Sequence, residues 1–110
     1  MIDDATLSEL IARLASAHDR EREEAADSVT DLTTAYAADQ AGRLVAVLTR
    51  LAGDEPDPAA REAQLHAAAE LVEWHPAARA AAEVESLDPA TLSPSEREYV
   101  EYLAESNGDH

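Results

Sequence analysis

The chain has 110 residues, 45% of them hydrophobic, which is enough for one buried core. Its formal net charge of −16 therefore does not by itself indicate disorder. The charge excludes nucleic acid and anionic membrane surfaces as partners, because both are negatively charged and would repel the chain.

The sequence predicts two helices in its first third. The first begins at Thr6, because Glu9 three residues later completes a capping-box pattern. Its apolar positions are Leu7, Leu10, Ile11 and Leu14. A second, longer helix follows a break at His18 or Asp19. Its apolar positions, at helical spacing, are Ala25, Ala26, Val29, Leu32 and Tyr36.

A third helix is predicted from Asp39 to Ala52, where Gly53 is a natural C-terminal stop. Residues 54–58 then form the clearest loop in the chain, since two prolines alternate with acidic residues there. The apolar side of the third helix is formed by Leu44, Val45, Leu48 and Leu51. A fourth helix follows at once, with Asp57 as its cap and Pro58 in its first position.

Two more helices are predicted in the last third. Pro76 ends the fourth helix and can start a fifth, in which alternating small and aliphatic residues share one side. Those residues are Ala77, Ala80, Ala81, Val84 and Leu87. Ser93, Pro94 and Glu96 then give a strong start signal for a last helix, with Tyr99, Val100 and Leu103 on its buried side. We expect one domain over residues 1–105 and a disordered tail over 106–110.

The second and fourth helices are related by a shift of about 39 positions, within the period of paired-helix repeats. The shift places Arg22 on Arg61 and Val29 on Ala68. On these residues the chain resembles HEAT-repeat proteins, in which antiparallel helix pairs stack into an α-solenoid. The resemblance implies an all-α fold of about five to six helices in a short stack. An irregular helical bundle is the alternative.

Two groups of side chains on the fourth helix could bind a ligand or partner. Glu62, His66 and Glu70 share one stripe, with Glu73 close by, and could either ligate a divalent cation or form an ordinary solvated face. Trp74 precedes a proline break, where a tryptophan usually packs under the turn as a structural anchor. An exposed Trp74 would instead be an interface hot spot. Off the buried stripe of the last helix, Tyr102 is a second interface candidate.

The sequence shows no pattern of catalytic chemistry. It has no glycine-rich phosphate loop, no paired-histidine zinc motif and no nucleophile in a recognisable setting. We therefore expect a protein that is not an enzyme and that has no cofactor and no metal. Cysteine is also absent, and neither a secretory signal nor a membrane span is visible, which favours a cytoplasmic location.

The expected partner is a basic protein, because an acidic surface steers and binds a cationic one. A compact acidic helical domain is similar to bacterial immunity proteins, and this resemblance implies an inhibitor that covers the cationic groove of a basic toxin or nuclease. The alternative is a HEAT-like scaffold or adaptor subunit. The residues predicted to bind the partner are Asp27, Asp31, Glu70, Glu73 and Trp74.

Overall fold

The computed structural model describes residues 1–105, which form five α-helices, three short 3-10 helices and no strand. The all-α class predicted from the helical periodicity is confirmed. The elements are α1 (Asp4–Leu14), α2 (Asp19–Asp31), α3 (Ala38–Asp54), α4 (Pro58–Trp74), η1 (Pro76–Ala81), η2 (Val84–Ser86), η3 (Pro89–Thr91) and α5 (Pro94–Ala104). Within residues 1–105, no helix is both long and apolar enough to cross a membrane. The predicted tail, 106–110, lies outside the described residues.

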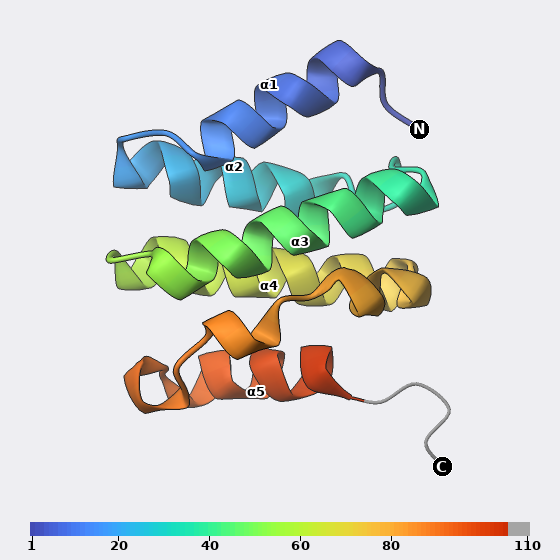
Figure 1. The fold of residues 1–110 in the computed structure, drawn as a ribbon. Coiled ribbons are helices and arrows are strands. Elements are labelled where there is room, and N and C mark those ends of the chain that lie inside the picture. Colours follow the sequence, from blue (N-terminus) through green and yellow to red (C-terminus); the bar gives the residue numbers. More distant parts are fainter. Residues whose placement is uncertain (106–110) are drawn as a thin grey trace.

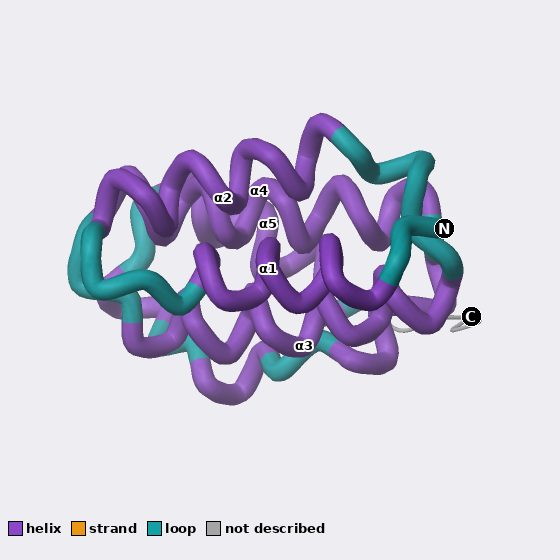
Figure 2. The backbone as a smooth tube through the Cα atoms, turned by 90° about the horizontal axis from the view of Figure 1, so that it is seen from above, coloured by secondary structure: helices purple, strands orange, loops and turns teal. Residues whose placement is uncertain are grey.

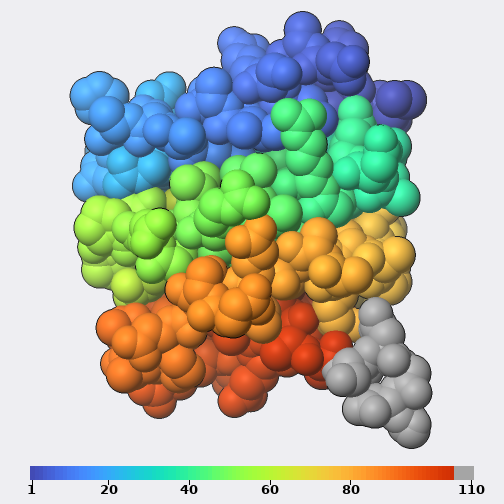
Figure 3. All heavy atoms as spheres, viewed as in Figure 1, coloured from blue at the N-terminus to red at the C-terminus, as the bar shows by residue number. Residues whose placement is uncertain are grey.

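The helices follow one another along the stack in the order of the sequence, and they alternate between two layers (Figures 1 and 2). One layer holds α2, α4 and α5, which run in the same direction; the other holds α1 and α3, with η1 and η2 packed against α3. Figure 3 shows the outcome as successive bands of the chain from one end of the molecule to the other. The shortest dimension, 19 Å, is close to the thickness of two helices.

Alanine lets the helices of the first layer approach closely. The contact between α2 and α4 buries small side chains from both helices, and small side chains shorten the distance between helix axes. The alanines of these two helices that have no exposed surface are Ala25, Ala26, Ala60, Ala67 and Ala68. Larger fully buried side chains, such as Leu14, Leu44 and Leu65, fill the space between the layers. Most apolar positions predicted for the first three helices are buried in this core, whereas Ala77 and Ala80 of the predicted fifth helix are exposed.

Two equivalent ion pairs join successive helices of this layer. The fourth residue of α2, Arg22, donates from Nε and Nη2 to the two carboxylate oxygens of Glu55 at 2.7 Å each. The fourth residue of α4, Arg61, donates from Nε to Glu96 at 3.0 Å. Both carboxylate side chains are only 2% exposed. The shift of about 39 positions thus relates residues with the same structural role.

Each of these carboxylates also accepts a backbone hydrogen bond beside the start of the next helix. Glu55 accepts from the backbone N–H of Asp57 at 3.1 Å, and Glu96 accepts from that of Ser93 at 2.8 Å. Burial alone would raise the pKa of Glu55 and of Glu96. The hydrogen bonds from the arginines and the backbone outweigh burial, so the pKa of each carboxyl is lowered and both remain charged.

The boundaries of the first two helices differ from the prediction. α1 begins at Asp4 because the Asp3 carboxylate, not Thr6, caps it and accepts from the Thr6 N–H at 2.7 Å. α2 ends at Asp31 and a turn follows, so it is shorter than predicted. Leu32, predicted to be on the buried side, is 42% exposed, whereas Tyr36 beyond the turn is buried as expected.

The predicted fifth helix is wrong. Residues 76–87 form the short 3-10 helices η1 and η2 because hydrogen bonds to α3 hold them in another path. The backbone N–H of Glu83 donates to Thr49 Oγ1 at 2.9 Å, and the Ser86 hydroxyl lies 3.4 Å from the Thr49 carbonyl. The predicted stop at Gly53 is also wrong, since α3 continues to Asp54. A Cβ at Gly53 would lie 2.6 Å from the Ser86 carbonyl oxygen, so glycine is needed there for close approach.

Candidate functional site

An acidic groove lies between α2 and α4 and extends from their N-terminal ends to the middle of both helices. It consists of two adjoining hollows of about 510 and 290 Å³. The two share Glu23, Asp27 and Ala59 in their lining, so they form one continuous surface, which we call the acidic groove. The complete lining is Asp19, Arg20, Glu23, Glu24, Asp27, Asp57, Ala59, Glu62, Ala63, His66 and Tyr99. Six of these residues are acidic and one is an arginine.

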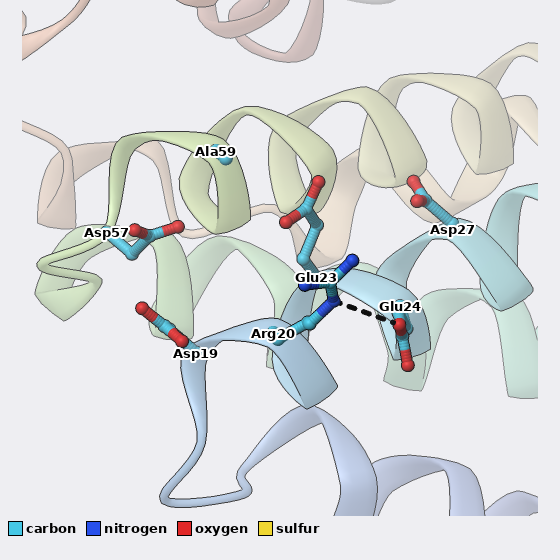
Figure 4. A pocket seen from close by; sticks show the side chains of 7 residues that line it. All are labelled: Asp19, Arg20, Glu23, Glu24, Asp27, Asp57 and Ala59. Atoms are coloured by element: carbon cyan, nitrogen blue, oxygen red, sulfur yellow. Dashed lines mark ion pairs between the residues drawn. The ribbon is translucent and has the colours of Figure 1, made fainter.

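Three carboxylates of the groove converge from two helices (Figure 4). Asp19 in the first turn of α2 points toward Asp57, the cap of α4, while Glu23 reaches into the space between the helices. Asp57 also accepts from the Ala60 N–H at 2.9 Å, and acidic groups at helix N-termini are favoured by the helix dipole. Local helix stabilisation therefore accounts for part of this charge, namely that of Asp19 and Asp57.

The arginine in the groove does little to offset its charge. Arg20 pairs with Glu24 one turn later at 3.6 Å, and the two side chains are 87% and 62% exposed. A pair this exposed contributes about 0.5 kcal/mol or less. With six carboxylates and one arginine, the lining has a formal net charge of −5, which is favourable for a cationic group and unfavourable for an anionic one.

An aromatic pair closes the other end of the groove. The rings of His66 on α4 and Tyr99 on α5 lie 5.5 Å apart, tilted by 39°. Burial, followed by the nearby carboxylates of Glu62, Glu70 and Glu98, raises the pKa of Tyr99. Its phenol therefore stays protonated and neutral over the physiological range.

No protein-family model matches this chain. Comparisons with curated proteins and with solved structures also find no significant match. The site must be interpreted from its own residues.

The residues predicted to bind a partner fall into two places on this side of the molecule. Asp27 lies in the acidic groove, whereas Glu70, Glu73 and Trp74 lie at the opposite end of α4. Asp31 is exposed at the end of α2. It lies at the same edge of the molecule as Trp74, because the neighbouring residue His75 hydrogen-bonds through Nε2 to the carbonyl of Thr33 at 3.0 Å.

The expectation that Trp74 packs under the turn is wrong, because its side chain is 57% exposed. The last turn of α4 is anchored instead by Leu71 and Val72, which are buried, and by the contact of His75 with Thr33. Because Trp74 is exposed, it is a candidate interface residue.

Tyr102 stands beside this end of α4 in a well-defined contact. Its hydroxyl donates to Glu73 Oε1 at 3.1 Å, and the guanidinium carbon of Arg79 lies 4.7 Å from the centre of its ring. Arg79 Nε also donates to the Tyr102 carbonyl at 3.1 Å. These contacts restrict the side chains of Glu73 and Tyr102. Less side-chain entropy would therefore be lost when a partner binds them.

Glu62, His66 and Glu70 do lie on one stripe of α4, but they do not converge on one point. The only close pair is His66 Nε2 with Glu70 Oε2, at 3.9 Å. Throughout the described part of the chain, no group of three or more histidine and acidic side chains is placed to hold a metal ion.

Four groove residues were not among those predicted to bind the protein partner, although one of them, Glu62, was a candidate cation ligand: Glu23, Asp57, Glu62 and Tyr99. A usable signal existed for two of them. The shift that places Arg22 on Arg61 also places Glu23 on Glu62. Acidic residues at equivalent positions of neighbouring parallel helices lie side by side, and here both line the groove, Glu23 from α2 and Glu62 from α4.

Proposed function

We propose that this protein is a non-enzymatic binding module that uses the acidic groove and the adjoining surface of α4 to bind a basic protein. The observation that carries the proposal is the groove lining, in which six carboxylates surround an open hollow with a single arginine. A cationic loop or helix of a partner would replace water there. A field of this sign would also raise the association rate by about 10- to 1000-fold at low salt.

The specific form that we favour is an inhibitor of the immunity-protein kind. A basic toxin or nuclease needs a cationic groove to bind its polyanionic substrate. An ordered acidic surface can occupy that groove and block the substrate by occlusion. The net charge of −16 supports this choice, because it attracts a basic partner from a distance as well as at contact.

The test is affinity capture from the cells that make the protein, with three baits. One is the unchanged chain and the second is Asp27→Lys with Glu62→Lys, two exposed groove residues. The third is a matched control, Glu9→Lys with Glu85→Lys, which makes the same change in net charge away from the groove. We expect one stoichiometric basic protein on the first and third baits, released by salt and absent from the second.

Equal capture by all three baits would show that the groove is not the binding surface and would refute the proposal. If the captured protein has an enzymatic activity, adding the purified chain should suppress it at a one-to-one ratio, and the groove variant should not. An unaffected activity would refute the inhibitor form.

A scaffold or adaptor subunit is the second candidate, favoured by the stacking of helices in two layers (Figure 2). Stacks of helix pairs present extended binding surfaces in HEAT-like proteins. The same capture separates the two functions. A salt-resistant set of several proteins that does not depend on Asp27 and Glu62 would support the scaffold.

A further inference from the structure

A single row of side chains leads from the acidic groove to Trp74. Glu62, His66, Glu70 and Trp74 follow one another at four-residue intervals on α4. Side chains at this interval are neighbours on one side of a helix. The row spans about 18 Å, since each residue of a helix advances by about 1.5 Å. Its first two members line the groove, so the row connects the groove with the far end of α4.

Trp74 is the exposed aromatic end of this row. It is one of three large hydrophobic side chains that are exposed within residues 1–105; the other two, Met1 and Leu32, lie outside α4. Tryptophan is enriched among the few residues that dominate binding at protein interfaces. In this position, it is preceded one turn earlier by the half-buried carboxylate of Glu70.

The fold already stacks an arginine on an aromatic ring at this end of the molecule. The guanidinium of Arg79 lies over Tyr102, whose hydroxyl is held by Glu73, the residue before Trp74. The combination there is a guanidinium, an aromatic ring and a carboxylate. Trp74, which is 57% exposed, and Glu70, which is 41% exposed and lies 3.9 Å from His66, offer the same kinds of group, an aromatic ring and a carboxylate, to an external guanidinium.

We propose that Trp74 and Glu70 form an arginine site, in which a guanidinium of the partner stacks on the indole and pairs with the carboxylate. This inference rests on the proposed function, because it assumes that the partner of the acidic surface is basic. It adds that the partner presents arginine here rather than lysine. Guanidinium is planar and weakly hydrated, so it can stack and bind a carboxylate together, whereas an ammonium keeps more of its water.

The test compares octa-arginine with octalysine, two peptides of equal charge. Trp74 is the only tryptophan in the chain, so its fluorescence reports directly on contact at the site. Calorimetry then gives the affinities of the unchanged chain and of Trp74→Ala, Trp74→Phe and Leu32→Ala. The last is a matched control, because Leu32 is also an exposed hydrophobic side chain but lies at the end of α2 rather than on α4. Circular dichroism checks that each variant is folded.

We expect octa-arginine to bind about two- to fivefold more tightly than octalysine and to change the Trp74 emission. Trp74→Ala should remove that preference, Trp74→Phe should keep part of it, and Leu32→Ala should leave it unchanged. Equal affinities for the two peptides, or a preference that survives Trp74→Ala, would overturn the arginine site.

The proposed function can survive that result. It stands if both peptides still bind the unchanged chain and lose affinity on Asp27→Lys with Glu62→Lys. If neither peptide binds at low salt, both the arginine site and the proposed acidic binding surface are wrong.

Discussion

Replacing Arg22 by alanine should be among the most destabilising single changes in this protein. Arg22 donates twice to Glu55 at 2.7 Å, and the Glu55 side chain is 2% exposed. Removing the arginine leaves a buried carboxylate whose remaining donors are Gln64 and the backbone of Asp57. Breaking a buried pair in this way costs about 3–5 kcal/mol. That is a large part of the total of about 5–15 kcal/mol typical of a domain.

Arg50→Ala is the matched control. Arg50 donates to Glu83 at 2.8 Å, nearly the same distance, but the two side chains are 63% and 35% exposed. Water replaces a lost partner at such a site, so the loss should be about 1 kcal/mol or less. The assay is urea unfolding at neutral pH, followed by far-ultraviolet circular dichroism and fitted for the free energy of unfolding.

A double variant tests the cause of the loss. Arg22→Ala with Glu55→Gln removes the unpaired charge while keeping a polar side chain opposite Gln64. It should therefore be more stable than Arg22→Ala alone. Equal losses for Arg22→Ala and Arg50→Ala would refute the reasoning, since burial would then not determine the value of the pair. If the double variant is no more stable than Arg22→Ala, the unpaired charge is not the cause of the lost stability.

Two further predictions concern pH and glycine. Because the pKa values of Glu55 and Glu96 in the folded state lie below the unfolded value of about 4.3, their contribution to stability is present above that pH and is lost as the pH falls through the folded pKa values. The stability difference between the unchanged chain and Glu55→Gln should thus shrink in acid; a difference that stays constant throughout the acid range would contradict this. Gly53→Ala should destabilise the protein, because its Cβ would lie 2.6 Å from the Ser86 carbonyl oxygen, whereas Gly42→Ala, with nothing within 4 Å, should stabilise α3 by up to about 1 kcal/mol. Thermal unfolding of the two glycine variants checks this, and shifts of the same sign would be the contrary result.

Helix starts were predictable where a cap and a proline occur together. Asp57 with Pro58 and Ser93 with Pro94 each begin a helix as predicted, because both the side-chain acceptor and the fixed backbone angle act within four residues. At Thr6 the capping-box pattern was misleading, since Asp3 offers a carboxylate three residues earlier and its Oδ1 accepts from the Thr6 N–H. Local signals are reliable only where no competing cap lies nearby.

Periodicity failed where distant hydrogen bonds determine the backbone. The spacing of Ala77, Ala80 and Ala81 is helical, but alanine buries too little surface to hold a helix against competing contacts. The contact of Glu83 with Thr49 joins residues 34 apart in sequence, and a short-range pattern cannot reveal it. The groove was similarly hidden, because it depends on which helices become neighbours. Trp74 follows Glu62, His66 and Glu70 at four-residue intervals, and this row of polar side chains was a signal in favour of an exposed tryptophan.

The two buried ion pairs have a consequence for how the protein unfolds. They connect residues that are 33 and 35 positions apart, and each one joins the start of one helix to an earlier helix of the layer. A simple stack of helices can fray from its ends, because every unit contacts only its neighbours. Here unfolding of the start of α5 would break the ion pair of Glu96 with Arg61 of α4. Unfolding of the start of α4 would likewise break the pair of Glu55 with Arg22 of α2. Amide hydrogens of α2, α4 and α5 should therefore exchange through a shared opening of the whole layer.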